Sequence, residues 1–234
     1  RTEFLAMLAH ELRNPLAPIT NAVHLLERGC ENRERRDAAL QILRRQTAHM
    51  TRLVDDLLEG SRITQGRIEL RMENVLVATS VLQAVEAARP LARERHQTLK
   101  VKVPTDLDLV ADPARLTQII SNLVTNAVKY TQEGGHVVVL VEKGRNDDVS
   151  IVVQDNGPGI SSALQPHLFE LFTQDRRTMD RSQGGLGIGL ALVKRLAELH
   201  GGHVRHETPK SGTGSRFVVC LPRGGRRATE RGQA

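Results

Sequence analysis

The segment Leu5–Leu26 reads LAMLAHELRNPLAPITNAVHLL, and its apolar residues recur in alternating steps of three and four. Such spacing places apolar side chains along one stripe of an α-helix. A second stripe with the same spacing follows in residues 40–57, after the charged, glycine-containing segment 28–36. The two stretches therefore predict an antiparallel helical hairpin. The stripes consist of Leu5, Leu8, Leu12, Pro15, Ile19, Ala22 and Leu26, and of Leu40, Leu43, Thr47, Met50, Val54 and Leu57.

The apolar seam of this hairpin is too narrow to stabilise two helices by themselves. Pairing with a second copy completes a four-helix bundle, so we predict a homodimer formed through residues 1–62. Pro15 and Pro18 lie inside the first helix, where a proline removes a backbone hydrogen bond, and we expect them to bend it.

The composition fits a core built from aliphatic side chains. The 234 residues suffice for two modest domains and include no Trp, one Tyr and four Phe. Cys30 and Cys220 lie far apart in no metal-ligand spacing, so we expect reduced thiols in a cytoplasmic protein.

The formal net charge of +6 mildly favours an anionic partner. No nucleic-acid motif accompanies it, so we expect no nucleic-acid partner.

No apolar run reaches the length of a membrane span, and no signal-peptide pattern opens the chain. We therefore expect no membrane contact within these residues. Because the first residues already belong to the periodic helix, we expect a fragment whose upstream part is missing. Any membrane anchor of the full-length protein would lie in that part.

The hydrophobic pattern changes after residues 60–66. Residues 67–222 alternate between strand-like and helix-like stretches, which predicts an α/β sandwich with one helical layer on a mixed, mostly antiparallel sheet. The fold class is therefore α+β, with the dimeric helical hairpin followed by this sandwich. Residues 223–234 carry several arginines and are expected to form a disordered basic tail. The expected strands are 67–72, 99–103, 135–143, 148–154, 202–207 and 215–221, and the expected helices are 77–95 (with a break near Pro90), 112–129 and 185–200.

Two side-chain amides share one face of the helix at 112–129. Asn122 and Asn126 stand four residues apart, and amide oxygens can bind Mg²⁺, with Asn126 the better candidate ligand. Lys129 and Tyr130 follow near the end of the helix, where they can reach a phosphate and a base. The alternative for the amides alone is a solvent-facing polar helix.

Asp155 follows an apolar strand and precedes Asn-Gly-Pro-Gly, with glycines at Gly157 and Gly159. A carboxylate only accepts hydrogen bonds, which suits the exocyclic amine of adenine. The glycines let the backbone turn sharply and approach a flat base. The alternative for this stretch is a simple β-turn.

Three glycines alternate with apolar residues just before the last expected helix, in Gly185-Leu186-Gly187-Ile188-Gly189. Glycine amides at a helix N-terminus can bind an anion, although the spacing matches neither the Rossmann motif nor the P-loop. Further on, Gly212-Thr213-Gly214 precedes the last expected strand, where the Thr213 hydroxyl can support the contact of Asp155 with a base. The alternative there is a hairpin turn.

The order of these motifs resembles the catalytic core of a sensor histidine kinase of a two-component system, over residues 1–222. The motifs that carry the resemblance are the H-box His10–Leu16, the N-box Asn122–Thr131, the first glycine box Asp155–Gly159, the F-box Phe169–Phe172 and the second glycine box Gly185–Gly189. The resemblance implies a phosphotransfer hairpin, residues 1–62, and an ATP-binding domain of the Bergerat type, residues 67–222.

By this resemblance, His10 is the residue that accepts the phosphoryl group of ATP. Counting Leu5 as heptad position a places His10 at position f, which is exposed. Glu11 would hydrogen-bond the second ring nitrogen. Asn14 would position a water for dephosphorylation of a response-regulator receiver domain, the partner that takes the phosphoryl group on an Asp. The residues implied to bind ATP are Asn122, Asn126 (with Mg²⁺), Lys129, Tyr130, Asp155, Gly157, Gly159, Gly185, Leu186, Gly187, Gly189 and Thr213.

Residues 160–184 are expected to form a lid over the nucleotide, with Arg176, Arg177 and Arg181 available to meet phosphate. One alternative function is that of a Bergerat-type ATPase, but those enzymes carry a water-activating Glu where this chain has Asn122. A second alternative is a dimerising scaffold with a non-catalytic nucleotide site.

Three histidines invite a metal interpretation, and they are His200, His203 and His206. We expect them to be structural or surface residues, because residues three apart on a strand point to opposite faces.

Overall fold

The structure of the protein is a computed structural model that describes residues 2–27, 32–144, 147–173, 186–209 and 213–225, with the side chains of residues 2–7 and of His10 excepted. The chain divides into two compact units. The hairpin unit comprises residues 1–66 and 171–188, and the sheet unit comprises residues 67–170 and 189–234. Within the described residues, no helix has the length and apolar character that a bilayer crossing requires.

The hairpin unit confirms the two predicted helices, α1 (Thr2–Glu27) and α2 (Arg33–Thr64). Asn32 caps α2, because its side chain accepts hydrogen bonds from the amides of the second and third residues that follow it, at 2.9 and 3.2 Å. Pro15 and Pro18 lie inside α1, and the helix continues through both of them.

A small apolar core holds residues 171–173 and 186–188 to the hairpin. Leu53, Leu186 and Ile188 are at most 2 % exposed. Gly60 of α2 provides the necessary space, because a Cβ atom there would lie 3.1 Å from the Cδ1 atom of Ile188. Partly buried side chains complete the core: Leu8, Leu12, Leu57, Ile63, Leu171 and Phe172.

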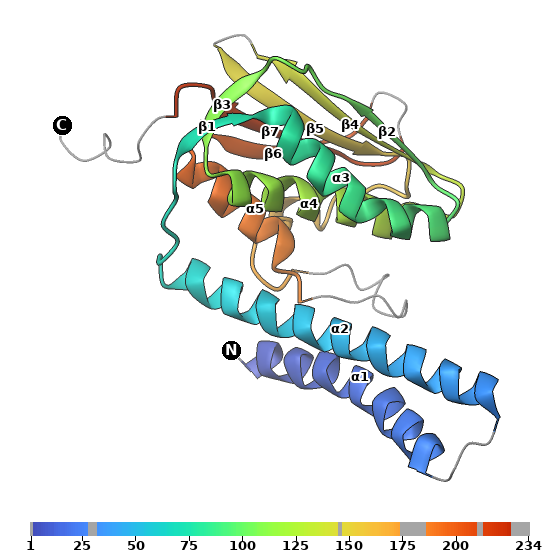
Figure 1. Cartoon of the computed structure of the whole chain (residues 1–234). Helices are drawn as coiled ribbons and strands as arrows, with labels where there is room; N and C mark the ends of the chain where they lie inside the picture. The colour runs from blue at the N-terminus through green and yellow to red at the C-terminus, as the bar shows by residue number, and fades with distance from the viewer. Residues whose placement is uncertain (1, 28–31, 145–146, 174–185, 210–212, 226–234) are drawn as a thin grey trace. The chain divides into compact units, whose positions relative to one another are not determined.

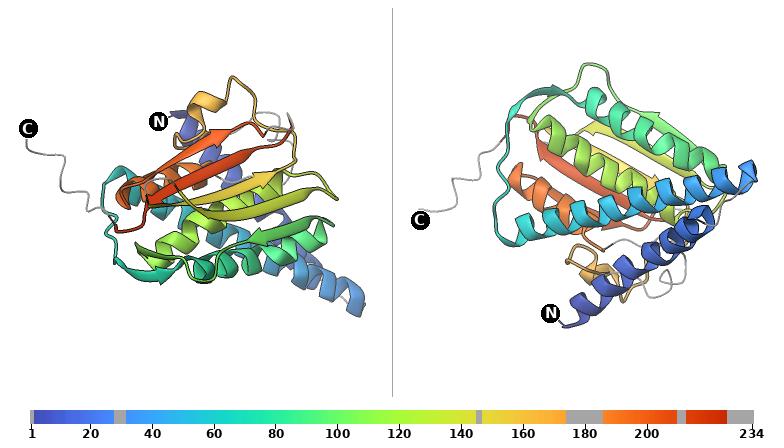
Figure 2. Two further views of the ribbon diagram at one scale, coloured as in Figure 1. Left: turned by 90° about the horizontal axis from the view of Figure 1, so that it is seen from above. Right: turned by 60° about the horizontal axis from the view of Figure 1, so that its bottom comes forward.

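The sheet unit confirms the predicted mixed sheet (Figure 1). The strand order is β2-β4-β5-β7-β6, in which only the β2–β4 pair is parallel. Helices α3, α4 and α5 cover one face of this sheet, as Figure 2 also shows. The strands are β2 (Thr98–Lys102), β4 (His136–Lys143), β5 (Asp148–Asp155), β6 (His203–Glu207) and β7 (Arg216–Pro222), and the helices are α3 (Val77–Glu94), α4 (Pro113–Tyr130) and α5 (Gly189–Leu199). A 3₁₀ turn, η1 (Gln165–His167), lies between β5 and α5.

Two expectations about the start of the sheet unit are wrong. Residues 67–72 form no strand; instead β1 (Glu73–Leu76) pairs with β3 (Asp108–Ala111) in a separate two-stranded sheet. The amide of Arg71 donates to the Asp112 side chain, so this backbone bonds to a carboxylate rather than to a strand. Pro90 does not break α3: the helix continues through this exposed residue to Glu94, and its buried apolar face extends past it to Ala92.

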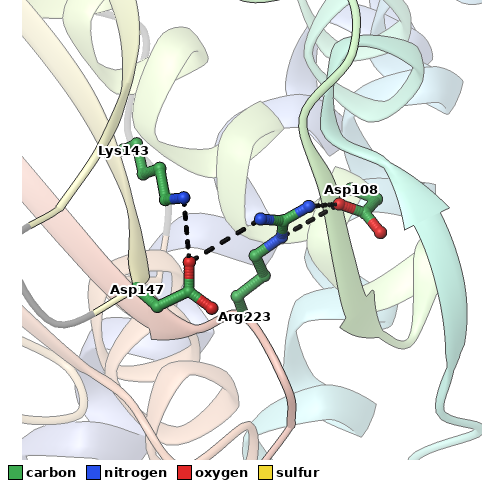
Figure 3. Close-up of polar contacts among 4 residues, drawn as sticks. All are labelled: Asp108, Lys143, Asp147 and Arg223. Carbon is green, nitrogen blue, oxygen red and sulfur yellow. Dashed lines mark hydrogen bonds and ion pairs between the residues drawn. The ribbon is translucent and has the colours of Figure 1, made fainter.

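The first residues of the expected tail are ordered. Arg223 pairs with Asp108 of β3 and, at 3.6 Å, with Asp147 in the β4–β5 turn, which also contacts Lys143 at 3.2 Å (Figure 3). The backbone carbonyl of Arg223 accepts a hydrogen bond from the amide of Val110 at 2.9 Å. The folded part of the sheet unit therefore extends beyond Pro222, and residues 226–234 lie outside the described residues.

His200 is a buried imidazole, 1 % exposed, just after α5. Its Nδ1 atom lies 2.7 Å from the carbonyl oxygen of Leu196, and its Nε2 atom accepts a hydrogen bond from the amide of Asp112 at 3.1 Å. These contacts require the neutral tautomer with the proton on Nδ1. Burial lowers the pKa of His200 below its ordinary value, against the opposing effects of the Leu196 carbonyl and the Asp112 charge.

We expect the sheet unit to lose stability as the pH falls below about 6.5, the ordinary pKa of histidine. The unfolded chain binds a proton at His200 before the folded chain does, so acid favours unfolding. The slope is at most about 1.4 kcal/mol per pH unit for this group. Melting temperatures between pH 5.5 and 7.5 should show a flatter profile for His200→Gln than for wild type. The matched control is His203→Gln at an exposed site, and an equally flattened control would contradict this role.

Candidate functional site

The predicted pair of amides lies beside the N-terminus of α5. Asp112 caps α4 by accepting a hydrogen bond from the amide of Arg115 at 3.0 Å, and Asn122 and Asn126 share one side of this helix. A Cβ atom at Gly189, the first residue of α5, would lie 3.8 Å from Cγ of Asn122 and 4.0 Å from Nδ2 of Asn126. The two amides and a helix N-terminus thus come together, which favours an anionic ligand.

One buried polar atom of Asn122 has no hydrogen-bond partner within the part of the chain that the structure describes. Its Nδ2 atom makes no hydrogen bond to any described residue. An unpaired buried donor costs about 1–3 kcal/mol, so this donor next to the α5 N-terminus is available to the oxygen of a ligand or of a water. The neighbouring Asn126 amide is suited to a cation bound to the same ligand, since amide oxygens are ligands for Mg²⁺.

Asp155 ends β5 and is 7 % exposed. Its Oδ1 atom accepts hydrogen bonds from the amides of Gly157 at 2.8 Å and Ser215 at 3.2 Å. Burial raises the pKa of Asp155, and the two amide bonds oppose that rise. Because both bonds use Oδ1, the Oδ2 atom remains available among the described residues to accept from a ligand donor.

The glycines around Asp155 allow close backbone packing. A Cβ atom at Gly157 would lie 3.0 Å from Oδ1 of Asp155 and 3.1 Å from the carbonyl oxygen of Tyr130. Gly159 has φ +73°, and a Cβ atom there would lie 3.1 Å from the carbonyl oxygen of Gly214, which has φ +90°. Three turns from distant parts of the chain therefore meet behind Asp155.

The remaining predicted ligand residues lie in varied surroundings. The Nζ atom of Lys129 is 5.2 Å from the ring centroid of Tyr130, which is 42 % exposed.

Two predicted ligand residues belong to the hairpin unit. Leu186 lies in its apolar core. Gly187 has φ +68°, and its carbonyl oxygen accepts a hydrogen bond from the amide of Phe172 at 3.0 Å. Thr213 is exposed on the turn before β7. Gly185, Arg176, Arg177, Arg181 and Cys30 lie outside the described residues.

The predicted phosphoacceptor lies in α1. His10 belongs to this helix, and its side chain is outside the described set. Glu11 is half-buried, and Asn14, one turn after His10, is exposed. The roles of these three residues stay predictions.

Sequence reasoning missed two supports of the site. The Ser215 amide contacts Asp155, although the nearby Thr213 hydroxyl was the expected support. Gln97, which is 9 % exposed, donates from Nε2 to the carbonyl oxygens of Val128 at 3.0 Å and Thr131 at 2.9 Å, and so caps the C-terminus of α4. The run Gly-Thr-Gly-Ser before β7 is a local signal for the Ser215 contact. No local pattern marks Gln97, because its hydrogen-bond partners lie 31 residues or more away in the sequence.

Two family models match the chain. Residues 1–66 match the His Kinase A (phospho-acceptor) domain, and residues 111–225 match the histidine kinase-, DNA gyrase B- and HSP90-like ATPase domain. The two matches correspond to the helical hairpin and to the sheet unit with its amide and carboxylate site.

Curated relatives align with nearly the whole chain. It is 32 % identical over 228 residues to the autoinducer 2 sensor kinase/phosphatase LuxQ of Vibrio parahaemolyticus, covering 95 % of this chain and 26 % of the relative. It is 35 % identical over 225 residues to the circadian input-output histidine kinase CikA of Synechococcus elongatus, covering 94 % and 30 %. The chain therefore spans less than a third of the length of these relatives.

A solved structure shares both the fold and the sequence pattern. The full-length structure of ShkA in complex with AMPPNP superposes with a TM-score of 0.69 at 31 % identity, covering 97 % of this chain and 47 % of that chain.

Proposed function

Since this chain belongs to the sensor histidine kinases, whose catalytic core it represents, we propose that it uses ATP to phosphorylate its own His10. A neutral ring nitrogen of His10 attacks the γ-phosphorus, forming an N–P bond as the bond from that phosphorus to the β–γ bridging oxygen breaks and ADP leaves. Histidine suits this step because a useful fraction of it is neutral near pH 7. Glu11, the next residue, hydrogen-bonds the other nitrogen and leaves the attacking one unprotonated.

The observation that carries the ATP assignment is the free acceptor of Asp155 together with the unpaired donor of Asn122. Oδ2 of Asp155 accepts from the exocyclic amine of adenine, and Nδ2 of Asn122 donates to a phosphate oxygen. Asn126 holds Mg²⁺, which when bound neutralises charge on the phosphates. Lys129, Tyr130, Gly157, Gly159, Gly185, Leu186, Gly187, Gly189 and Thr213 complete the proposed ATP site.

A homodimer through residues 1–62 is part of this proposal. The hairpin exposes large apolar side chains that its own two helices do not cover, including Val54 at 47 % and Leu58 at 54 %. A second copy that packs its hairpin on these side chains makes a four-helix bundle. The exposed members are Leu16, Val23, Leu25, Leu40, Val54 and Leu58.

We further propose that the phosphoryl group passes to an Asp of a response-regulator receiver domain in the cytoplasm. In that step the N–P bond of phosphorylated His10 breaks as an Asp oxygen bonds to phosphorus. Asn14 is exposed one turn after His10 and positions a water for a separate phosphatase reaction, in which the water oxygen bonds to phosphorus as the bond from phosphorus to the Asp oxygen breaks and phosphate leaves. The name of LuxQ joins kinase and phosphatase, which supports a dual activity here.

The test is incubation of the purified protein with γ-labelled ATP and Mg²⁺. We expect label that is labile to acid and stable to alkali, as phosphohistidine is. Trypsin cleavage after Arg1 and Arg13 releases residues 2–13, in which His10 is the sole histidine, so mass spectrometry at neutral pH assigns the site. Label on the peptide that carries His24 instead would overturn the assignment to His10.

The same incubation separates the two alternative functions. A hydrolytic ATPase would release phosphate without labelling the protein, and a scaffold would do neither. Asn122 disfavours hydrolysis, because an amide cannot accept a proton from water at neutral pH.

Replacing Asn122 by Leu, which has a similar shape, is expected to separate stability from binding. The free energy of unfolding without nucleotide should rise by about 1 kcal/mol, because the buried unpaired amide is removed. ATP affinity should fall at least roughly tenfold, since the phosphate donor is lost. Thermal denaturation and calorimetric titration with an ATP analogue measure the two effects. Thr125→Ala, an exposed site on the same helix, is the control, and unchanged affinity in Asn122→Leu would contradict the role.

A further inference from the structure

Asp112 joins three separate segments of the sheet unit. It is 7 % exposed and occupies the N-cap of α4. Its Oδ1 atom accepts from the amide of Arg115, at 3.0 Å, in the first turn of α4. Its Oδ2 atom accepts from the amide of Arg71, at 2.9 Å. Its own amide donates to Nε2 of His200 at 3.1 Å. Both carboxylate oxygens and the backbone amide are thus each committed to a different segment.

One of the three segments is the connector, residues 65–72, that leads from the end of α2 to the start of β1. The connector contains no helix or strand beyond the turn at its start. The side chain of Ile68 is buried, at 7 % exposed, and the amide of Arg71 bonds to Asp112 of the sheet unit. The end of the connector nearest to β1 is therefore held to the sheet unit in part by the Oδ2 atom of Asp112.

The other two segments lead to the proposed nucleotide site. Asp112 starts the helix that carries Asn122 and Asn126. His200 follows the end of α5, whose first residue, Gly189, faces those two amides. Asp112 therefore stands where the connector meets the ends of both helices that form the amide site.

We propose that Asp112 is a positioning residue for autophosphorylation, holding the connector to the base of the two nucleotide-binding helices and thereby setting the length of the tether to His10. The inference rests on the proposed function. Transfer between two linked units depends on their effective concentration, which falls with about the −3/2 power of tether length. Gln65 and Gly66 still bond to Ser61 and Ile63 of α2, so with Arg71 bonded the tether comprises residues 67–70, whereas without that bond it extends to residue 72, just before β1. The change from four to six residues lowers the effective concentration roughly twofold.

Asp112→Ser is the variant that isolates the connector contact. Serine is an equally good N-cap and keeps the bond to the amide of Arg115, but it has a single side-chain oxygen and leaves the amide of Arg71 unbonded. Arg71→Pro removes the same bond from its other side and leaves Asp112 intact. Asp112→Ala removes the cap as well and shows the effect of general damage to α4.

The experiment measures the rate of autophosphorylation at saturating ATP, the affinity for an ATP analogue, and the exchange of the Arg71 amide with deuterium. For Asp112→Ser and Arg71→Pro alike, we expect the rate to fall roughly twofold while the affinity for the ATP analogue stays unchanged. In Asp112→Ser, we also expect faster exchange at Arg71. The double variant should be no slower than either single variant, because both remove one bond.

Two outcomes would overturn the inference. One is an unchanged or higher rate in either single variant; the other is a parallel loss of ATP affinity and melting temperature, which would indicate a purely structural cap. Failure of the proposed function is distinguishable from both, because the wild-type protein would then carry no acid-labile label.

Discussion

Asp155→Asn is expected to lower the affinity for ATP by at least about 100-fold and leave the fold intact. The asparagine oxygen can keep the two amide bonds from Gly157 and Ser215, so the turn behind it survives. At the position of Oδ2, however, an NH₂ donor would face the amine donor of adenine. Leaving two buried donors opposed costs about 3 kcal/mol, which corresponds to the stated loss.

The stability of this variant has a definite expected sign. Burial raises the pKa of Asp155, so the folded chain binds its proton more tightly than the unfolded chain does. At neutral pH the charged carboxylate therefore costs stability, and its neutral replacement should not lower the melting temperature. Titration with an ATP analogue and thermal denaturation give both quantities, with Asp155→Glu as a variant that keeps the acceptor. An Asp155→Asn protein that binds ATP like wild type would contradict the adenine assignment.

Acid should weaken nucleotide binding of the wild-type protein through the same group. Protonation converts Oδ2 into a donor or a weaker acceptor, and the raised pKa of Asp155 moves this loss above the ordinary range of an aspartate. Binding titrations at decreasing pH check the sign of this effect.

Gly214→Ala is expected to have the largest effect on stability. A Cβ atom at this position would overlap the carbonyl oxygen of Asp155 and lie 2.8 Å from its carbonyl carbon, and the backbone has φ +90°. The carbonyl belongs to the last residue of β5, which is held by two neighbouring strands, so it cannot move aside. We expect the free energy of unfolding to fall by more than about 3 kcal/mol, with loss of ATP binding.

Gly134→Ala is the matched control for this variant. Gly134 has φ +75°, but a Cβ atom there would meet nothing within 4 Å. It therefore measures the cost of the backbone conformation alone, which is about 1 kcal/mol. Denaturant unfolding compares the two variants, and equal losses would show that the close approach of Gly214 to Asp155 contributes nothing.

The sequence alone predicted most of the architecture, because it is encoded in local patterns. The alternating steps of three and four marked α1 and α2, and the pair Asn122 and Asn126 has the spacing that places two side chains on one helix face. The expected and observed strands agree for β2, β4, β5, β6 and β7 within a few residues.

The errors share a physical cause, which is tertiary contact overriding local preference. The short strand β3 has four residues and exists because β1 pairs with it, which no local pattern announces. The alternating residues 67–72 fail to form a strand because Asp112, distant in sequence, accepts the hydrogen bond of Arg71. Likewise, Arg223 looked like part of a solvated tail, but its partner Asp108 stands 115 positions earlier in the chain.

The pairing of β5 with β7 has an evolutionary consequence. These strands are neighbours in the sheet, yet everything from residue 156 to residue 215 is inserted between them. Closing a flexible loop depends only logarithmically on its length, so a doubling costs about 0.6 kcal/mol. Insertions and deletions that leave α5 and β6 intact are therefore thermodynamically cheap, and the segment between the two glycine-rich motifs can change length from one descendant to the next while the sheet keeps its register.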